Sequence, residues 1–408
     1  MSSSRARSQR YGGTRLVGAG VVGLALVVGL SGCQPGTAAG TAAPAATASA
    51  APAVITVEGT EVAGSVRPDQ PLVVTAAGGA LTEVAVTTPE GAPVAGALGE
   101  GGQRWTSTDP LAPATRYAVH AVARNAAGAS ATRDAEVATL TPATTAFPAV
   151  APLSGSTVGV GMPIIVTLDE PVAEDRRAAV EEQLRVSTDP QGVVGAWSWQ
   201  SATKVEFRPE NYWPAHTKVH VDLDLGSVEV SPGVWGTTRD IDFTVGSAMV
   251  SHVDIAAHTL TVTEDGTVLR TIPVTLGQSG SGGRYVTRSG TKVIMSLEKS
   301  RQMDAETTGV SKDDPNYYNV AVKYAMRLTN SGEFLHAAPW SVGSQGRANV
   351  SHGCTGMSTA DAQWMFAHSK VGDVVTYSGS DRAIEAGNGF DVWNESFADW
   401  KGGSALPS

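Results

Sequence analysis

From about residue 54 onward, hydrophobic and polar residues alternate along most of the chain, which is the pattern of β-strands that have one buried face. Turn-forming residues separate these short segments, as in "PDQ", "PEGAP", "GEGG" and "NAAG". Short alternating strands at such spacing are typical of β-sandwiches. The pattern predicts one sandwich over residues 54–147, with Trp105 in its core, and a second over residues 148–248.

The second predicted sandwich includes one helical stretch, "EDRRAAVEEQL", in which acids and arginines recur at helical spacing. Neither sandwich contains a cluster of residues suited to acid–base catalysis or to metal binding. His120, His216 and His220 stand singly within strand patterns, which favours surface or structural positions. We therefore interpret both modules as spacers or docking surfaces.

A third β-rich domain is predicted over residues 249–380. Its first stretch, from about His252, is expected to form two strands around a turn at Asp265-Gly266, because Asp-Gly between apolar segments is a strong hairpin signal. A second pair of strands is expected around Ser289-Gly290. Further strands are expected in "YNVAVKYAMRLT", "EFLHAAPW" and "DVVTYSG". The chain as a whole is therefore expected to be mainly β.

One helix is expected in the third domain, within "STADAQWMFAHSKVGD". Ser358 and Asp361 stand at capping-box spacing at its start, and Gly372 is expected to end it. Its buried face is expected to comprise Ala362, Met365, Phe366 and Ser369. Residues 381–408 form a C-terminal extension whose aromatic side chains are expected to pack back onto this domain: Phe390, Trp393, Phe397 and Trp400.

The N-terminus has the pattern of an export signal. Residues 1–15 carry four arginines and no acid, and an uncharged apolar run of about 15 residues follows, shorter than the ~20 that span a membrane. Leu30-Ser31-Gly32-Cys33 resembles the lipobox of bacterial lipoproteins. This resemblance implies that residues 1–32 are removed and that Cys33 carries a diacylglycerol anchor; an ordinary secretory signal is the alternative. Small residues with Pro and Gly over residues 33–53 predict a flexible linker.

Composition narrows the possible partners. The chain carries 29 Lys plus Arg against 39 Asp plus Glu, a net charge of −10, and loss of the four signal arginines would make it about −14. Such acidity argues against binding to nucleic acid and against a polybasic membrane patch. The length suggests about three domains at ~150 residues each. With Cys33 acylated, Cys354 is left as a free thiol in an exported protein, which is either a reactive group or a buried, inert one.

The neighbours of Cys354 favour a reactive thiol. A cysteine attacks as thiolate, and its ordinary pKa near 8.5 must be lowered by a partner. His352 is too close in the chain for easy contact, whereas two strands joined by "SVGSQGRAN" could place His336 opposite Cys354. A Cys–His pair is the arrangement of activated nucleophiles. Gly353 would let the backbone approach a substrate carbonyl, with adjacent N–H groups as an oxyanion hole.

At these residues the chain resembles a known family. His336 followed by Ser351-His352-Gly353-Cys354 resembles the signature of the L,D-transpeptidases, which have a YkuD-type catalytic domain. The acylated cysteine, linker, two modules, catalytic domain and aromatic tail resemble the actinobacterial lipoprotein members. The resemblance implies two immunoglobulin-like β-sandwich domains, then a YkuD-type domain with a short helix and an aromatic C-terminal tail.

The resemblance also implies a reaction. The cysteine would attack a tetrapeptide stem of peptidoglycan, release D-Ala, and pass the acyl group to the amine of an acceptor stem, giving a 3→3 cross-link. Carbapenems would acylate the same cysteine. No cofactor and no metal are expected. The protein would work at the outer face of the cytoplasmic membrane, held by its lipid, in the cell-wall or periplasmic space.

Individual roles follow from the same resemblance. Cys354 would be the nucleophile and His336 the base, oriented by the backbone carbonyl of Ala337. The oxyanion hole would comprise the backbone N–H groups of His352, Gly353 and Cys354. Substrate-binding residues would be Met303, Tyr318, Trp340, Ser351, His352 and Gly356. Gly356 stands where the family pattern has Asn, and the family's Thr-Pro-x-Gly run is replaced by "SGSGGRYVT".

Four alternatives to this family differ from the sequence or from its expected reactivity. A papain-like peptidase has Cys before His, the reverse of the order here. A sortase needs an Arg soon after its cysteine, whereas the first one here is Arg382. Zinc sites need three or four ligands, and the chain has neither C-x-x-C nor H-E-x-x-H. A non-catalytic or weakly active wall-binding lipoprotein is the remaining alternative, and it would not react with a carbapenem.

Overall fold

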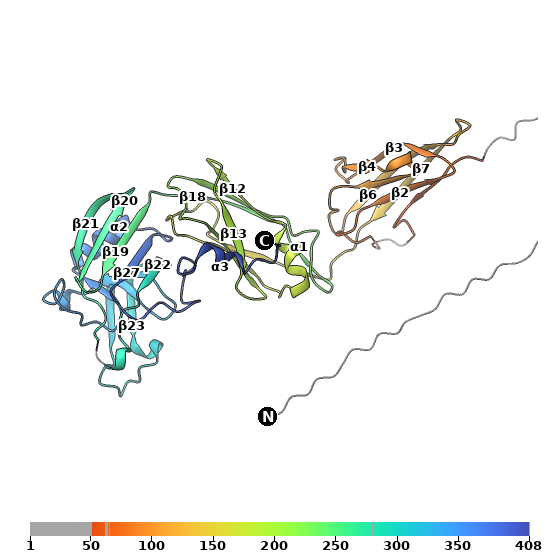
Figure 1. Cartoon of the computed structure of the whole chain (residues 1–408). Helices are drawn as coiled ribbons and strands as arrows, with labels where there is room; N and C mark the ends of the chain where they lie inside the picture. The colour runs from red at the N-terminus through yellow and green to blue at the C-terminus, as the bar shows by residue number, and fades with distance from the viewer. Residues whose placement is uncertain (1–50, 62–63, 65, 280, 408) are drawn as a thin grey trace, which may run out of the picture. The chain divides into compact units, whose positions relative to one another are not determined.

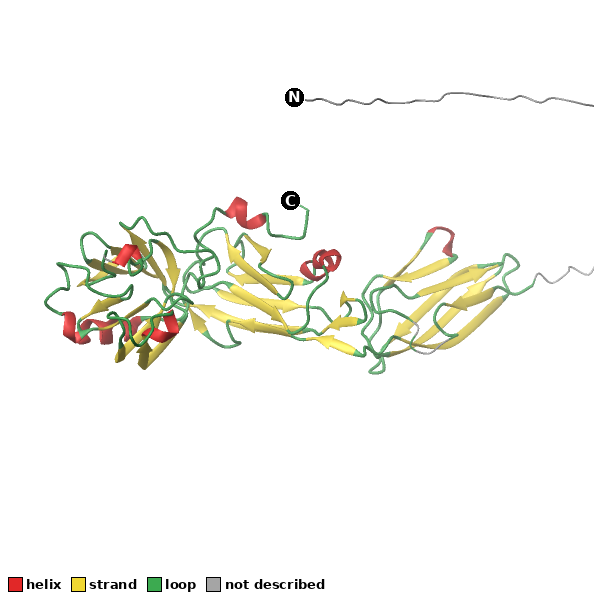
Figure 2. Ribbon diagram, turned by 90° about the horizontal axis from the view of Figure 1, so that it is seen from below, coloured by secondary structure: helices red, strands yellow, loops and turns green. Residues whose placement is uncertain are grey.

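The computed structural model describes residues 51–61, 64, 66–279 and 281–407. Within these residues it contains twenty-seven strands and three α-helices, which confirms the mainly β prediction (Figure 2). The predicted signal peptide, Cys33 and most of the predicted linker lie outside the described residues. None of the helices that the structure describes is long and apolar enough to cross a membrane.

The first module is a two-sheet sandwich built from the strands predicted by alternation. One sheet has the order β1-β2-β5-β4 and the other β3-β6-β7. Trp105 is buried in the core between them, as predicted. The strands are β1 (Val54–Val57), β2 (Val73–Ala77), β3 (Ala80–Thr87), β4 (Gly96–Leu98), β5 (Arg104–Ser107), β6 (Arg116–Arg124) and β7 (Ser130–Ala138).

The second module pairs two four-stranded sheets, ordered β10-β18-β15-β12 and β13-β14-β11-β9, and a three-stranded sheet, β16-β17-β8. Its predicted helical stretch forms a short 3-10 turn and α1 (Arg177–Glu181). The strands are β8 (Thr144–Ala146), β9 (Pro148–Ala151), β10 (Thr157–Val158), β11 (Ile164–Leu168), β12 (Leu184–Asp189), β13 (Gly195–Trp199), β14 (Lys204–Pro209), β15 (Lys218–Leu223), β16 (Glu229–Ser231), β17 (Val234–Gly236) and β18 (Arg239–Val245).

The three isolated histidines have structural surroundings. His120 and His220 lie on strands and contact Asp134 and Asp242 across the sheet, at 2.6 and 3.0 Å. His216 lies outside the strands, at a positive φ of 62°, with its ring 3.8 Å from Asp265.

The third domain begins with three strands where the sequence predicted two: β19 (Met249–Asp254), β20 (Thr259–Glu264) and β21 (Thr267–Pro273). The turn before β20 lacks Gly and Pro and relies on His258 at φ 58°, so no turn signal was visible. The predicted hairpin turn is confirmed, because Asp265 and Gly266 both have positive φ, 47° and 80°.

The expected strand before Ser289 is absent, and only β22 (Gly290–Val293) forms there. Polar contacts to other loops hold this segment instead. The Thr287 hydroxyl donates to the Gly353 carbonyl at 2.8 Å, and the Arg288 N–H donates to the Glu333 carboxylate at 3.1 Å. The segment therefore supports the loop that carries Cys354.

Two sheets form the body of this domain (Figure 1). One has the order β21-β20-β19-β27-β22, with β27 (Val374–Ser378) parallel to β19. The other has the order β23-β24-β25-β26. Its strands are β23 (Ser296–Asp304), β24 (Asn319–Arg327), β25 (Phe334–Ala337) and β26 (Thr355–Met357). β25 and β26 are parallel, with His336 opposite Gly356.

The predicted helix is α2 (Thr359–His368). Its N-cap is Ser358, whose hydroxyl accepts the Asp361 N–H at 3.1 Å, as the capping-box spacing indicated. Of the predicted face, Ala362 and Met365 are buried. The helix ends at His368, before the predicted stop at Gly372.

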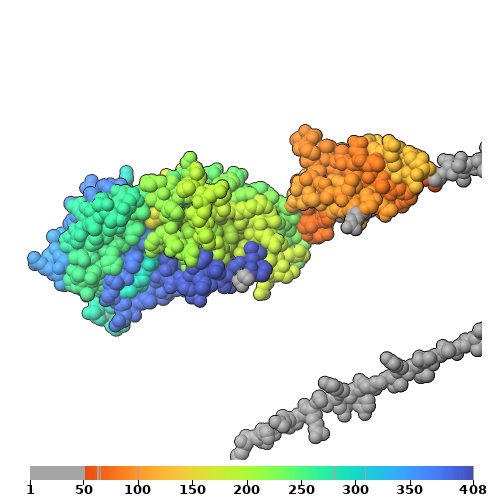
Figure 3. Space-filling view, turned by 45° about the horizontal axis from the view of Figure 1, so that its top comes forward, coloured from red at the N-terminus to blue at the C-terminus, as the bar shows by residue number. Residues whose placement is uncertain are grey.

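The C-terminal extension contacts two domains, not only the third as predicted. Its first part pairs with the third domain, where Asn394 accepts the Thr291 N–H at 2.7 Å. Its aromatic end, with α3 (Phe397–Lys401), lies on the second module (Figure 3). The indole N–H groups of Trp393 and Trp400 donate at 2.8 Å to Gly161 and Ala196 carbonyls of that module. The Arg208 guanidinium stacks on three of the aromatic rings, Trp393, Phe397 and Trp400.

Candidate active site

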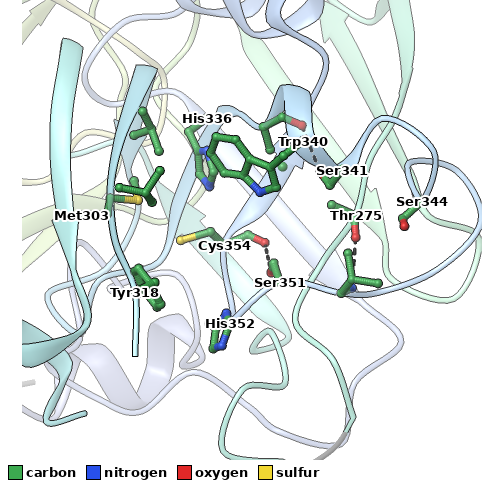
Figure 4. A pocket seen from close by; sticks show the side chains of 15 residues that line it. Thr275, Met303, Tyr318, His336, Trp340, Ser341, Ser344, Ser351, His352 and Cys354 are labelled. Atoms are coloured by element: carbon green, nitrogen blue, oxygen red, sulfur yellow. Dashed lines mark hydrogen bonds between the residues drawn. The ribbon is translucent and has the colours of Figure 1, made fainter. Parts of the chain in front are cut away.

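A cavity of about 570 Å³ in the third domain brings together most of the residues predicted for the site (Figure 4). Its lining is largely apolar, with a few polar groups, which is typical of ligand sites. Ala337 and Gly353 do not line it. The predicted residues that do are Met303, Tyr318, His336, Trp340, Ser351, His352, Cys354 and Gly356.

Parallel pairing of two strands positions the histidine and the cysteine. His336 is on β25, and Cys354 directly precedes β26. The register pairs Leu335 with Thr355 and His336 with Gly356. The 18-residue separation in sequence is thus closed by backbone hydrogen bonds, and His336 and Cys354 face one cavity.

The His336 imidazole is oriented by its own strand. Its Nδ1 lies 2.8 Å from the Ala337 carbonyl oxygen. Because a carbonyl only accepts hydrogen bonds, we assign the proton to Nδ1, which leaves Nε2 with a free lone pair. Burial lowers the pKa of His336, and the Ala337 bond opposes this only in part. The ring is therefore neutral near pH 7 and able to accept a proton.

The Cys354 thiol is neutral in this state. Its Sγ donates to the Gly332 carbonyl at 3.6 Å. Burial raises the thiol pKa to about 12, while the Phe334 N–H, Lys292 and Arg327 act in the opposite direction. This differs from the expectation of a lowered pKa, because desolvation of the thiolate outweighs the nearby positive groups.

The proposed oxyanion donors are not equivalent. The Gly353 N–H donates to the Ser351 hydroxyl at 3.2 Å, and that hydroxyl donates to the Cys354 carbonyl at 2.6 Å. The Gly353 amide is therefore engaged in this state, and the amides of His352 and Cys354 remain the candidates. Gly353 itself has φ 122°, a conformation that favours glycine.

The second histidine lies on the other side of the cysteine from His336 (Figure 4). The His352 ring packs against Tyr285 and Tyr318, with centroids at 4.5 and 5.0 Å. Burial lowers the pKa of His352, and Asp314 acts against this. His352 is thus held between two aromatic rings, whereas the His336 ring is oriented by the Ala337 carbonyl.

The wall and rim of the cavity are aromatic and apolar. Met303 and Tyr318 flank the sulfur on the side of β23 and β24 (Figure 4), and burial raises the pKa of Tyr318 to about 12. Trp340 is 60% exposed at the rim, and its ring centroid lies 6.1 Å from that of His336. An exposed tryptophan beside a buried imidazole offers a surface for a bound peptide.

Gly356 lies in a confined part of the cavity. A Cβ atom at this position would lie 2.9 Å from the Ala338 Cβ and 3.1 Å from the Thr275 Cγ2. The first contact is closer than a Cβ atom tolerates, and the second would require the Thr275 side chain to move by a few tenths of an ångström. The side chains around position 356 therefore fit a glycine better than a larger residue.

Several residues of the site were missed from the sequence. Thr275, Ser341, Ser344 and Val350 also line the cavity; Ser341 ends a short 3-10 helix and the others lie in loops, with no motif of their own. Glu333 and Lys292 form a buried ion pair behind the cysteine loop. The one available signal was a charged residue within each of the apolar segments "GEFLHAA" and "TKVIM".

Two protein families match the sequence. Residues 248–376 match the family described as L,D-transpeptidase catalytic domain (YkuD). Residues 63–229 match the bacterial Ig domain family. The immunoglobulin-like and YkuD-type domains implied by the sequence resemblance are thus confirmed.

Individual relatives agree with these matches. L,D-transpeptidase 2 of Mycobacterium tuberculosis is 36% identical over 356 residues, which cover 86% of this chain and 85% of that protein. L,D-transpeptidase 1 of the same organism is 39% identical over 230 residues, 56% of this chain and 84% of that protein. The solved structure of LD transpeptidase LdtMt1 in complex with imipenem is similar, with a TM-score of 0.50 and 37% identity. It covers 58% of this chain and 100% of that chain.

Proposed function

Because the chain belongs to the L,D-transpeptidase family of acyltransferases, which act on peptidoglycan stem peptides, we propose that it forms 3→3 cross-links through a thioester on Cys354. One observation carries this proposal. His336, with its Nδ1 held by the Ala337 carbonyl, shares an apolar cavity with the free thiol of Cys354. This is a nucleophile, a base and a group that orients the base.

Acylation begins from neutral partners. As the sulfur attacks the carbonyl carbon of the donor peptide bond, Nε2 of His336 takes the thiol proton. The negative charge that develops on the carbonyl oxygen is stabilised by the His352 and Cys354 amides. The tetrahedral intermediate breaks its C–N bond, and His336 returns the proton to the departing D-Ala amine. Cys354 is left as a thioester.

Transfer repeats these steps in reverse order. The side-chain amine of an acceptor stem attacks the thioester carbon, and His336 takes a proton from the attacking nitrogen. The C–S bond then breaks, the new amide is released, and the sulfur regains its proton from His336. The His336 ring thus acts as base and as acid at different stages, and the proposed steps need no cofactor.

The donor peptide is proposed to lie along the apolar wall. Met303 and Tyr318 cover the donor, Trp340 stacks on it at the rim, and Ser351 holds the loop backbone. Gly356 adds no side chain to its confined side of the cavity. The Ser351 role is supported by its two hydrogen bonds, to Gly353 and Cys354.

Intact-mass spectrometry tests the proposal directly. The purified protein should gain one imipenem mass, and Cys354→Ala should gain none while keeping its melting temperature. Incubated with a tetrapeptide stem, the wild-type protein should release D-Ala and yield a 3→3 dimer. An unmodified wild-type protein that still binds peptidoglycan would instead support the non-catalytic, wall-binding alternative.

We further infer that the protein is exported and held at the outer face of the cytoplasmic membrane by a lipid on Cys33. The support is the sequence alone, from the basic start to the lipobox. Cells that express Cys33→Ser should release the protein from the membrane fraction, and palmitate labelling should be lost. Unchanged labelling of the variant would contradict the inference.

A further inference from the structure

A buried ion pair lies directly behind the loop that carries Cys354. The Lys292 ammonium, fully buried on β22, lies 2.5 Å from the Glu333 carboxylate, which is 5% exposed and precedes β25. The other carboxylate oxygen accepts the backbone N–H and the guanidinium of Arg288, at 3.1 and 3.0 Å. Both charges are thus partnered inside the domain.

A buried ion pair of this kind contributes little to the stability of a folded domain. Removing two charges from water costs several kcal/mol per ion, and replacing a buried pair by neutral side chains is often neutral or stabilising. The position of the pair therefore calls for another account.

Glu333 reaches the nucleophile from one side. It directly follows Gly332, whose carbonyl accepts the Cys354 thiol. Its carboxylate also lies over Gly353, because a Cβ at Gly353 would be 3.9 Å from the Glu333 Oε1. A shift of Glu333 would therefore move both the acceptor of the thiol and the residue before the sulfur.

Lys292 reaches the nucleophile from the other side. Its Nζ lies 3.8 Å from the centroid of the Tyr377 ring. The Tyr377 hydroxyl is hydrogen-bonded to the Thr355 hydroxyl at 2.8 Å, and Thr355 directly follows Cys354. The pair thus supports the residues before and after the nucleophile.

We propose that Glu333 and Lys292 are positioning residues for acyl transfer, which hold the Cys354 loop between them and set the local charge at the sulfur. This rests on the proposed role of Cys354 as nucleophile. Neither side chain lines the 570 Å³ cavity that holds His336 and Cys354, so they act through the loop.

The two charges act on the sulfur in opposite directions. Glu333 raises the pKa of the Cys354 thiol, and Lys292 lowers it. Of the other charged groups around the pair and the sulfur, Arg327 also lowers the thiol pKa, and Arg288 contacts both Glu333 and Glu385. If Glu333 and Lys292 acted only by packing, replacing either one would change the reactivity of Cys354 in the same direction. If they act through charge, the two replacements should change it in opposite directions.

The test compares Glu333→Gln with Lys292→Met by the rate of Cys354 alkylation with iodoacetamide at fixed pH. Glu333→Gln should react faster, because the Lys292 ammonium stays on the Tyr377 ring. Lys292→Met should react more slowly, because Arg288 keeps Glu333 charged. A pKa change of one unit would alter the thiolate fraction about tenfold and, because nucleophilicity changes with it, the rate about threefold.

The double variant Lys292→Met/Glu333→Gln separates charge from position. Its alkylation rate should return to near the wild-type value, because equal and opposite charges are removed. Its kcat for cross-linking should still fall about tenfold or more with little change in KM, since the support of the loop is lost. Its melting temperature should stay near that of the wild type.

Glu206→Gln, at a buried glutamate of the second module that pairs with the partly exposed Lys204, is the control and should change neither rate. Equal changes in both single variants, or none, would overturn the proposal. If Lys292→Met does not fold, the other two variants still decide. Faster alkylation of Glu333→Gln that is reversed in the double variant would support the proposal. An alkylation rate of Glu333→Gln equal to that of the wild type would contradict the proposal. Imipenem acylation of the wild-type protein shows separately whether Cys354 is the nucleophile.

Discussion

At the scale of single residues, burial rather than a neighbouring charge decides the protonation of Cys354 and His336. Burial raises the pKa of Cys354 and lowers that of His336, so both groups are neutral at pH 7. In the proposed reaction, the proton therefore moves from the thiol to His336 as the sulfur attacks.

His336→Ala tests whether the imidazole affects the ionisation of the resting thiol or only the reaction with substrate. Because burial sets the thiol pKa, the alkylation rate of Cys354 should be almost unchanged and should keep rising with pH between 6 and 9, without a plateau. Cross-linking should fall about 10²- to 10⁴-fold, because the general base is lost. Stopped alkylation time courses across this pH range, beside a D-Ala release assay, measure both. A plateau near pH 7 that only the wild type shows would mean that the imidazole ionises the thiol.

Gly356→Asn tests the departure from the family pattern. If glycine were a defect at this position, Asn would improve turnover. A side chain here would crowd Ala338 and Thr275 and force them to shift, so the structure predicts a loss of about 1–3 kcal/mol of stability and lower turnover. Gly343→Asn is the control, because nothing lies within 4 Å of its added Cβ. Higher turnover with unchanged stability would show that the loop adapts.

At the scale of elements, the parallel pairing of β25 and β26 assembles the site, and the irregular segment before β22 supports it. Thr287, at the centre of that segment, accepts the Gly277 N–H and donates to the Gly353 carbonyl, both at 2.8 Å. It thus joins two loops to the nucleophile's neighbour. A regular strand at this place would not offer those contacts.

Thr287→Val removes both hydrogen bonds at nearly constant volume. We expect a loss of about 1–3 kcal/mol in the free energy of unfolding, and a fall in kcat, because Gly353 is no longer held. Urea unfolding and imipenem acylation rates measure the two effects. Thr217→Val, a buried threonine that donates to Pro214 in the second module, should lose stability and keep its acylation rate. Equal acylation rates for both variants would exclude a role for Thr287 in the site.

At the scale of the whole molecule, the third domain is joined to the second module through buried polar groups. Asp373 is the clearest case. A Cβ at Gly159 of the second module would overlap it, and among the described residues its Oδ1 has no hydrogen-bond partner. Burial raises the pKa of Asp373 to about 7, with Lys370 acting against this and Glu264 with it.

This raised pKa predicts a pH dependence of stability. Folding favours the protonated carboxyl, so its contribution is complete below pH 4, the unfolded value, and is lost as pH rises through about 7. Between these limits stability should fall by up to about 4 kcal/mol. Asp373→Asn should remove this part of the slope in thermal unfolding from pH 4 to 8. Asp109→Asn, at an exposed carboxylate of the first module, is the control and should retain it.

Much of the architecture was visible in the sequence because local patterns carry it. Alternation placed most strands, Asp265-Gly266 marked its hairpin, and Ser358 with Asp361 marked the helix start. The turn at His258 and the segment before Ser289 were not visible, since the first lacks turn-forming residues and the second is held by distant side chains. The second contact of the aromatic tail was missed because Arg208 lies in another domain.

The sequence by itself determined the fold class, the order of modules and the identity of the Cys354 and His336 candidates, because these follow from short periodicities and a compact motif. Only the tertiary structure decided the protonation of the thiol, the engagement of the Gly353 amide, the confinement of Gly356 and the ion pair behind the nucleophile. Each of these depends on burial or on contacts between residues distant in the chain. Desolvation and packing are properties of the folded environment, and a linear pattern does not contain them.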